Sequence, residues 1–317
     1  MKMLLGALLF LFSTTLSAVA QIASVDYTPT FTRCPNNFSL VRLAGPSPDQ
    51  QFLSFGEQTY VESRRSNVLP NAWKAYLENV LATNVSLPEY VSSILGGDTN
   101  VYGPNFAISI SGGGYRAATF GAGVLNVLDG QNASSVSIGT GGLLQAATYI
   151  AGLSGGSWLV SSLAQANYPT MQNLIFGSQD PSAYAGWLTQ FDVFTPSTNV
   201  TSDLEYLESL VGEISGKYAA GFRVSLTDIW ARGLSRHFLN GTTADNIFNA
   251  SLAHGAGITF SNFSNLLSFY PCTVCMSNGA DFSTGLHSFP IPNHSHFSWL
   301  ISNQFTAINL ISKPQMT

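Results

Sequence analysis

The residues best suited to chemistry lie in the pentapeptide Gly152-Leu153-Ser154-Gly155-Gly156. It fits the pattern Gly-x-Ser-x-Gly, in which glycines permit a strained turn that exposes a serine hydroxyl as a nucleophile. Residues 157–165 have helical composition, and a helix N-terminus favours negative charge on reacting oxygens. A plain glycine turn is the alternative, because such a short pattern also arises by chance. The pentapeptide alone therefore indicates a serine hydrolase of unspecified mechanism.

A second glycine run, Ser111-Gly112-Gly113-Gly114, precedes Tyr115 and Arg116. Consecutive glycines at the end of a strand can turn successive N–H groups toward one point, as an oxyanion hole requires. A phosphate-binding loop is the alternative, but neither G-x-G-x-x-G followed by an acidic residue nor G-x-x-x-x-G-K-[ST] is present. An oxyanion loop preceding a nucleophile elbow explains both glycine runs together.

Arg116 is unusual because the segment around it is almost uncharged. A guanidinium in such a place needs a negative partner, and it matches phosphate or carboxylate with paired donors. The residues leave two partners open: a carboxylate of the protein, in a structural salt bridge, or a phosphate of the substrate.

The elements that must position these residues follow one order. An apolar run at 106–110 predicts a strand, the glycine turn follows, and small and apolar residues at 115–128 predict a buried helix. The order nearly repeats with the apolar run 141–150, the turn at 152–156 and the helix at 157–165. We therefore expect an α/β fold with a central, mostly parallel sheet flanked by helices and with sites at the ends of its strands.

Elsewhere the patterns are those of ordinary globular packing. Helical spacing of apolar residues predicts helix within Val68–Leu95, whereas the segment from about Tyr270 shows no periodicity and is assigned no regular element. The helical spacing involves Trp73, Leu77, Val80 and Leu81, and aromatic anchors follow at Trp187, Tyr206, Trp230 and Phe238.

Composition narrows the classes of partner. Charged residues make up only 9% of the 317 residues, the net charge is −5, and no run of Lys or Arg is present. We expect no nucleic-acid partner and no electrostatic capture by anionic membranes, so any contact with lipid should be hydrophobic. No stretch beyond the first twenty residues is long and apolar enough for a transmembrane segment.

Residues 1–20 read as a secretory signal peptide, with Lys2 before the apolar run 3–12 and the small-residue site Ala18-Val19-Ala20. We expect a secreted protein, extracellular or associated with the cell wall, whose mature chain begins at Gln21. Secretion fits eight Asn-x-Ser/Thr sites, which predict N-glycosylation at most of their asparagines. These are Asn37, Asn84, Asn132, Asn199, Asn240, Asn249, Asn262 and Asn293.

Three cysteines, Cys34, Cys272 and Cys275, are an odd number for an oxidising compartment. The Cys-x-x-Cys pair has no second such pair and no regularly spaced histidines after it, so we expect no metal site. The odd count suggests that a cysteine partner lies outside this sequence.

Residues 106–125 and 141–164 closely resemble the fungal lysophospholipase or phospholipase B family, whose catalytic domain is related to cytosolic group-four phospholipase A. The resemblance covers most of residues 34–265 and includes Cys34-Pro35 and the segments 70–74, 217–222 and 225–230. It implies a patatin-like or cytosolic-phospholipase-like catalytic domain acting on phospholipids and lysophospholipids at membrane or micelle surfaces.

The resemblance also implies the roles of individual residues. Ser154 would be the nucleophile of a serine–aspartate dyad, Gly113 and Gly114 would supply oxyanion-hole N–H groups, and Arg116 would bind the substrate phosphate. Catalysis would pass through an acyl-serine and need no metal or organic cofactor.

The chain departs from the family near its end. Relatives continue into a Pro-Phe-Pro-rich strand and a long C-terminal half that carries the aspartate in an Asp-Gly context, which Asp281 does not match. We therefore expect a signal peptide at 1–20, the N-terminal part of the catalytic domain at 21–268 and a divergent tail at 269–317. The C-terminal part of the domain, with the aspartate, is expected beyond this sequence.

Two other functions stay open. The chain could be a secreted glycoprotein of this family without catalytic competence, since the aspartate is not found. It could also be an α/β-hydrolase esterase with a histidine base, for which His237 and His254 are the candidates before the tail.

Overall fold

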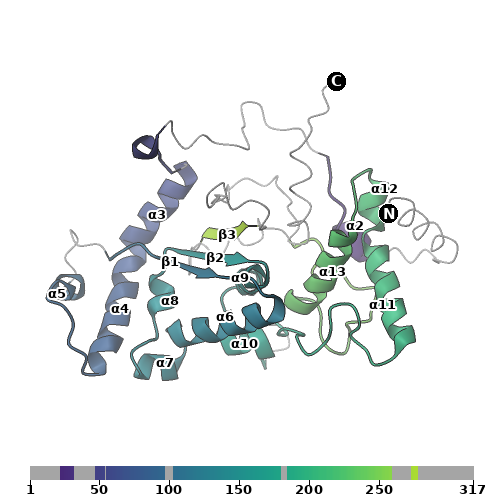
Figure 1. The fold of residues 1–317 in the computed structure, drawn as a ribbon. Helices are drawn as coiled ribbons and strands as arrows, with labels where there is room; N and C mark the ends of the chain where they lie inside the picture. Colours follow the sequence, from purple (N-terminus) through teal and green to yellow (C-terminus); the bar gives the residue numbers. More distant parts are fainter. Residues whose placement is uncertain are drawn as a thin grey trace.

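A small parallel sheet lies at the centre of the molecule (Figure 1). The computed structural model describes residues 22–31, 47–53, 55–96, 103–179, 184–258 and 273–277, the last by its backbone alone. Strands β1 (Ala107–Ile110), β2 (Tyr149–Leu153) and β3 (Thr273–Ser277) lie in the order β1-β2-β3. Both strand pairs are parallel, which confirms the expected type of sheet.

Strand β3 corrects one expectation. It lies in the segment that was assigned no regular element, yet its Cys275 pairs with Ala151 of β2. A five-residue strand with Cys and Ser among its residues carries little periodicity, and the neighbouring strand decides whether it forms. The segment therefore contributes to the same sheet as the glycine turns.

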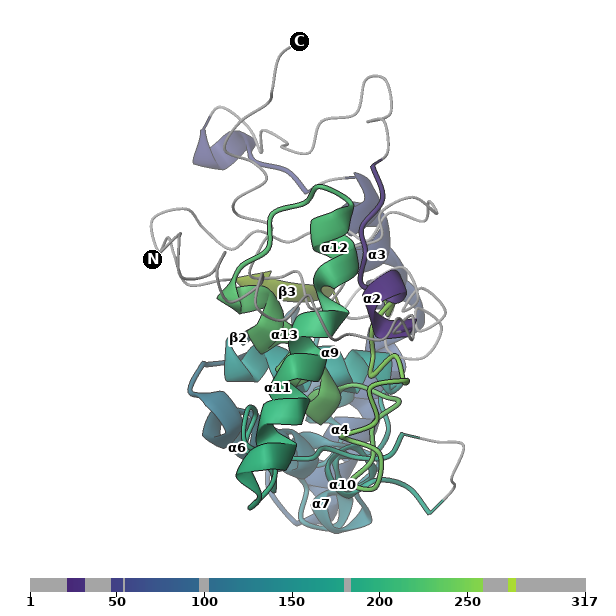
Figure 2. The ribbon, with the colours of Figure 1, turned by 90° about the vertical axis from the view of Figure 1, so that its right-hand side faces the viewer.

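Helices surround the sheet. In Figure 1, α3, α4 and α5 lie on the left, α6, α9 and α10 lie close to the sheet, and α2, α11, α12 and α13 lie on the right. Figure 2 looks at that right-hand side and places α11, α12 and α13 nearest the viewer. The helices are α2 (Ile22–Asp26), the 3-10 turn η1 (Pro48–Gln50), α3 (Phe55–Asn67), α4 (Leu69–Ala82), α5 (Val91–Leu95), α6 (Gly114–Leu128), α7 (Ala133–Ser137), α8 (Leu143–Ala146), α9 (Gly155–Gln165), α10 (Met171–Phe176), α11 (Val200–Glu213), α12 (Ser215–Ala219) and α13 (Leu226–Phe238).

The main core forms between the sheet and the helices that follow its strands. Buried residues of α6 and α9, such as Leu125 and Leu159, meet Ile150 of β2 and extend to Trp187 and Phe238. Apolar area removed from water here is the main stabilising contribution to the fold. The aromatic anchors were predicted correctly for Trp187, Tyr206 and Phe238, which are buried, whereas Trp230 is partly buried.

The structure agrees with the helix predicted within residues 68–95 but differs from the prediction for the apolar run 141–150. Helix α4 confirms the helical spacing, with Trp73 and Leu77 buried and Leu81 41% exposed. The apolar run 141–150 holds the short helix α8 as well as the start of β2. Arg64, which is fully buried, donates to the carbonyls of Gln145 and Ala147 and so fixes the chain between these two elements.

A buried ionic network joins α11, α12 and α13, which lie on the right in Figure 1. Glu213 at the end of α11 accepts hydrogen bonds from Arg232, at 2.6 Å, and from Arg236 of α13. Lys217 of α12 pairs with Asp228, whose carboxylate also caps the first turn of α13. Buried charges are tolerated when they are paired and hydrogen-bonded, as these are.

Candidate active site

Ser154 occupies a sharp turn between β2 and α9. Its backbone has φ 52° and ψ −120°, a conformation that is strained for a residue with a side chain, and the residue is exposed. Strand β2 ends at Leu153, and α9 begins at Gly155. The turn thus has the strand-to-helix setting that the Gly-x-Ser-x-Gly pattern requires.

The glycines around Ser154 are imposed by close backbone packing. A Cβ atom at Gly155 would lie 2.2 Å from the Gly114 carbonyl oxygen, and one at Gly156 would lie 2.4 Å from the Ile110 oxygen. A Cβ at Gly152 would lie 2.4 Å from the Gly156 oxygen. The first two contacts press the serine turn against the turn after β1, so side chains there would separate the two turns.

The glycine loop lies directly beside the serine. A Cβ at Gly112 would approach the Ser154 Cβ to 3.0 Å and its Oγ to 3.6 Å. Gly113 and Gly114 have φ values of 142° and 66°, which glycine adopts without strain. The N–H groups of Gly113 and Gly114 donate to no acceptor among the described residues, as is usual at the start of a helix. The structure therefore brings together the residues proposed as nucleophile and oxyanion donors.

Arg116 is the third residue of α6 and its only charged residue. Its side chain is exposed, and within the described part of the chain it makes no ion pair and no hydrogen bond. The structural salt bridge that the sequence left open has no partner in that part. Among the described residues, no carboxylate competes with an anion from solution for this guanidinium.

Aromatic side chains support both turns from the interior. Tyr115, which follows the glycines, meets Trp158 of α9 with ring centroids 6.0 Å apart and Phe238 of α13 at 5.6 Å. Such edge and tilted contacts each add to the stabilisation from buried area. Sequence reasoning missed this role of Tyr115. The available signal was an aromatic residue directly after one glycine turn and another, Trp158, four residues after Ser154.

The general base is not found among the described residues. The Ser154 hydroxyl has no hydrogen-bond partner there, and Asp281 lies outside the described residues. His237 and His254 are buried rather than superficial. His237 Nδ1 bonds the Gly233 carbonyl at 2.8 Å, so this side chain is engaged with its own helix.

His254 is held by two contacts. Its Nδ1 lies 2.9 Å from the Thr242 hydroxyl, and its Nε2 lies 2.8 Å from the Asn249 carbonyl. Burial, with a smaller contribution from Arg236, lowers the pKa of His254 to about 4, and burial also lowers the pKa of His237. Both histidines are therefore neutral at pH 7, and neither hydrogen-bonds to Ser154.

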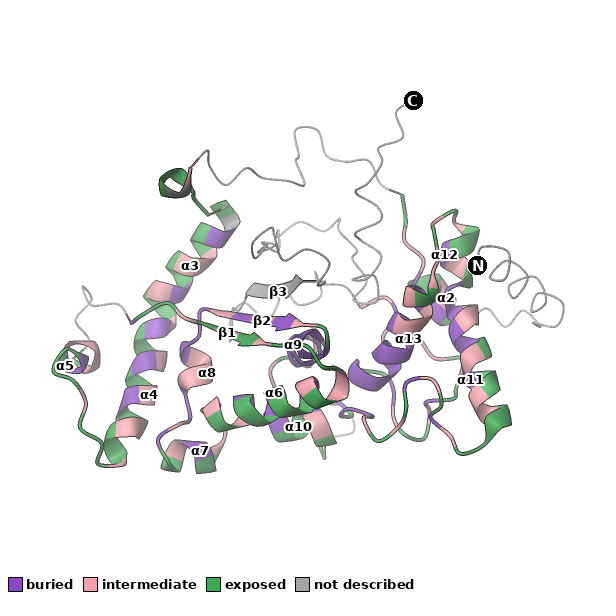
Figure 3. Cartoon of the chain, viewed as in Figure 1, coloured by how far each residue is buried: buried purple, intermediate pink, exposed green. Residues whose placement is uncertain are grey.

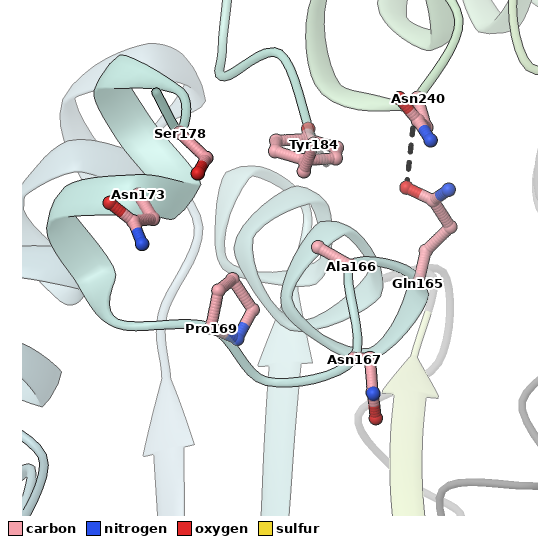
Figure 4. Close-up of a pocket in the computed structure, with 8 residues that line it drawn as sticks. All are labelled: Gln165, Ala166, Asn167, Pro169, Asn173, Ser178, Tyr184 and Asn240. Atoms are coloured by element: carbon pink, nitrogen blue, oxygen red, sulfur yellow. Dashed lines mark hydrogen bonds between the residues drawn. The ribbon is translucent and has the colours of Figure 1, made fainter. Parts of the chain in front are cut away.

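A cavity of about 270 Å³ lies at the far end of α9 (Figure 4). Gln165, Ala166 and Asn240 line it, and Gln165 accepts a hydrogen bond from the Asn240 backbone at 3.2 Å. Ser154 directly precedes the same helix, which is about 16 Å long at 1.5 Å per residue. This cavity is therefore separate from the serine turn.

The predicted glycosylation sites differ in exposure and in the contacts of their side chains. Asn84, Asn199, Asn240 and Asn249 are exposed, and Asn132 is partly buried. The Asn132 and Asn199 oxygens cap α7 and α11. Asn37, Asn262 and Asn293 lie outside the described residues, as do the predicted signal peptide, Cys34 and Cys272.

Taken together, the parallel sheet, the serine turn and the adjoining glycine loop define an α/β domain of hydrolase type. Residues 106–284 match the lysophospholipase catalytic domain family, and the chain belongs to that family. The match extends past residue 268 and includes β3. No helix within the described residues is both long and apolar enough to cross a membrane.

Several fungal proteins are similar to the chain. It is 34% identical over 255 residues to lysophospholipase 2 of Aspergillus fumigatus. The aligned region covers 79% of this chain and 39% of that protein. It is 34% identical to probable lysophospholipase 3 of Schizosaccharomyces pombe, covering 80% of this chain and 34% of that protein. Lysophospholipase 2 of Candida glabrata is 33% identical, and the aligned region covers 80% of this chain and 33% of that protein. The chain thus spans between a third and two fifths of these relatives, and no solved structure matches it.

Proposed function

We propose that this protein is a secreted lysophospholipase of the phospholipase B type. It hydrolyses fatty-acyl esters of lysophospholipids and phospholipids through an acyl intermediate on Ser154. The observation that carries the proposal is the contact between the two turns, which sets the Ser154 hydroxyl beside the Gly112–Gly114 loop at the start of α6. Membership of the lysophospholipase catalytic domain family supports the class of substrate.

The proposed chemistry uses each of these parts. Ser154 Oγ loses its proton to a base and attacks the ester carbonyl, and the N–H groups of Gly113 and Gly114 bind the resulting oxyanion. The glycerol oxygen leaves with a proton, and water then attacks the acyl-serine to release the fatty acid. Removing one oxyanion donor typically slows such a reaction about 10²–10³-fold. Arg116 binds the phosphate of the substrate, and hydrolysis through an acyl-serine uses no metal or organic cofactor.

The base in this proposal is an aspartate from outside the described residues, in a serine–aspartate dyad. A histidine base fits less well, because both ring nitrogens of His254 and one of His237 are bonded to other groups. The patatin-like arrangement of the complete catalytic domain is part of the same proposal.

Secretion and glycosylation complete the proposal. The exposure of Asn84, Asn199, Asn240 and Asn249 is compatible with glycans at these positions. Glycans would provide the polar surface that a chain with 9% charged residues otherwise lacks. Contact with a membrane or micelle would rest on apolar side chains, since the net charge is −5.

Substitution of the serine tests the activity. The catalytically active form of the enzyme, with the aspartate present, and its Ser154→Ala variant are assayed for fatty-acid release from lysophosphatidylcholine micelles, with Ser157→Ala as a matched control. Ser157 is buried and bonds the Gly152 carbonyl, so it does not face substrate. We expect Ser154→Ala to lose at least about 10³-fold in rate, as removal of a covalent nucleophile does. Equal rates for wild type and Ser154→Ala would contradict the assignment.

A second candidate is a member of the family that has lost catalysis. The observation in its favour is that the Ser154 hydroxyl has no partner among the described residues. It predicts no fatty-acid release from the wild-type chain and no labelling of Ser154 by a fluorophosphonate, which reacts with activated serines. Labelling of wild type, absent from Ser154→Ala, would exclude this candidate.

A further inference from the structure

The cavity at the far end of α9 lies where two buried helices end. Helices α9 and α13 are buried along most of their length, as Figure 3 shows, and they end at Gln165 and Phe238. Asn240 follows α13, and its backbone N–H donates to the Gln165 side chain at 3.2 Å. This bond ties the segment after α13 to the end of α9, so the wall of the cavity joins parts of the chain that are far apart in sequence.

The side chains that line this cavity are uncharged. Amide and hydroxyl groups of Gln165, Asn173 and Ser178 line it together with the apolar side chains of Ala166 and Pro169. Figure 4 shows Gln165 on one side of the cavity, with Asn173 and Ser178 on the other. Such a lining suits a neutral ligand that carries hydroxyl groups as well as C–H surface, because polar groups fix a ligand and apolar groups cover it. A sugar ring has this chemistry, whereas a phosphate or a bare acyl chain does not.

The size of the cavity suits a single sugar ring. Its volume is about 270 Å³, slightly below the range of about 300–1,000 Å³ for sites that hold drug-sized ligands. So few contacts would hold a free sugar only weakly. A sugar that is covalently attached next to the cavity is present at an effective concentration on the order of millimolar, so weak contacts are enough to hold it.

Asn240 provides such an attachment point. It begins Asn240-Gly241-Thr242, which fits the acceptor pattern for N-glycosylation. Its Oδ1 accepts a hydrogen bond from the Gly241 N–H at 3.0 Å, and its Nδ2, the atom that carries an N-linked glycan, donates to no acceptor among the described residues. Asn240 is exposed and also lines the cavity. A sugar on Nδ2 therefore begins at the edge of the cavity, with no linker to span.

The third residue of this acceptor pattern is hidden in the folded chain. Thr242 is 1% exposed, and its hydroxyl lies 2.9 Å from His254 Nδ1. In the pattern Asn84-Val85-Ser86, by contrast, the serine is exposed. The pattern requires the hydroxyl residue, so the transferring enzyme must reach Thr242 before this segment folds. A glycan on Asn240 is therefore already in place when the segment folds against the end of α9.

We propose that the cavity at the end of α9 is the binding site of the first N-acetylglucosamine of a glycan on Asn240. The sugar fills the cavity and bonds to its amides, including Asn173 of α10, whose side chain has no partner among the described residues. It thereby stabilises the junction of α9, α10 and the segment after α13. The proposal rests on the glycosylation that forms part of the proposed function, and it adds a structural role for one sugar.

Enzymatic release of the glycan tests this binding directly. The full chain is secreted from a yeast and treated with an amidase that cleaves the bond between asparagine and the first sugar, and mass spectrometry of glycopeptides follows each site. We expect release from Asn240 to be at least about tenfold slower than release from Asn84 in the folded protein, because the bound sugar must first leave its cavity. After heat denaturation both sites should be released at the same rate. Equal rates in the folded protein overturn the proposal.

A cavity-filling variant tests whether the cavity causes this protection. Ala166→Leu places a larger side chain among the lining residues, and it should bring release from Asn240 to within about threefold of release from Asn84. Ala220→Leu is the matched control, because Ala220 follows α12 as Ala166 follows α9 and both are partly buried. This control should keep the difference between the two sites. Protection that survives Ala166→Leu overturns the proposal, because the segment itself would then shield the bond.

Thermal unfolding provides a second measurement that does not depend on the cavity-filling variant. Asn240→Gln should lower Tm by about 2–4 °C, as the loss of about 1 kcal/mol does in domains of about 150–250 residues. Ser86→Ala removes the acceptor pattern at Asn84 and should leave Tm within about 1 °C of wild type. Protein trimmed by an endoglycosidase to one sugar per site should also keep its Tm. Equal values for Asn240→Gln and Ser86→Ala, or a loss on trimming equal to that of Asn240→Gln, overturn the proposal.

These outcomes separate the proposal from the proposed function. Sugar on Asn84 but not on Asn240 rejects the binding site and keeps the proposed glycosylation, whereas sugar on neither rejects both. Slow release from Asn240 in a protein whose fatty-acid release does not depend on Ser154 keeps the binding site and rejects the proposed activity.

Discussion

At the scale of single residues, the candidate site is built by glycines that allow two backbone turns to touch. The contacts at Gly155 and Gly156 are with the backbone of the β1–α6 turn, so any side chain there would push the turns apart. Ser154 accepts a strained backbone conformation in the same turn. Strain of this kind costs about 1–3 kcal/mol and persists where surrounding structure enforces it.

Arg116 carries a prediction at this scale. Arg116→Ala should slow hydrolysis of a lysophospholipid about 10–100-fold more than hydrolysis of a neutral monoacylglycerol, because only the former offers a phosphate for charge-assisted hydrogen bonds. The two substrates are compared in the form of the enzyme that is active, and Arg116→Lys serves as the variant that keeps the charge. Equal losses on both substrates would remove the assigned role.

At the scale of elements, α11, α12 and α13 are joined by buried charge. Glu213 and both of its arginine partners are fully buried, whereas the pair of Lys74 and Glu78 on α4 is exposed at 3.9 Å. Exposed pairs contribute about 0–1 kcal/mol, but removing one member of a buried pair costs about 3–5 kcal/mol, because the other charge is left uncompensated.

This contrast predicts the effect of two matched substitutions. Glu213→Gln should lower the free energy of unfolding by about 3 kcal/mol or more, since two buried guanidinium groups lose their only carboxylate among the described residues. Glu78→Gln should change it by less than about 0.5 kcal/mol. Urea denaturation followed by circular dichroism measures both. Similar small effects would mean that the network does not hold these helices together.

At the scale of the whole molecule, the buried histidines predict how stability depends on pH. The pKa of His254 lies near 4 in the folded chain and at an ordinary 6.5 in the unfolded chain. The unfolded chain therefore binds the proton first as the pH falls. Stability should be fully present above about pH 6.5 and should decline toward pH 4 by roughly 2–3 kcal/mol.

The measurement is denaturation of wild type and His254→Gln between pH 4 and 7. Glutamine keeps a donor that can reach the Asn249 carbonyl but does not titrate, so the variant should show a shallower decline. The remaining slope includes His237, whose pKa burial also lowers. Identical slopes for the two proteins would contradict the role of His254.

Local features of the sequence were enough to predict the strand and the helix on either side of the glycine turn at 111–114. Residues 106–110 and 115–128 were predicted as strand and helix, and the structure has β1 at 107–110 and α6 at 114–128. These signals are strong because glycine turns interrupt long apolar runs. The run 141–150 was less informative, since a short apolar stretch suits a helix turn and a strand equally well.

By itself, the sequence determined the family, the serine turn, the glycine loop and the isolated arginine, because each depends on residue type at fixed spacing. Tertiary structure alone decided that Gly112 lies against Ser154, that His237 and His254 are engaged elsewhere, and that β3 joins the sheet. It also decided that the outer side of α6 is open. Contacts between residues far apart in the chain set all of these features, and local patterns do not encode such contacts.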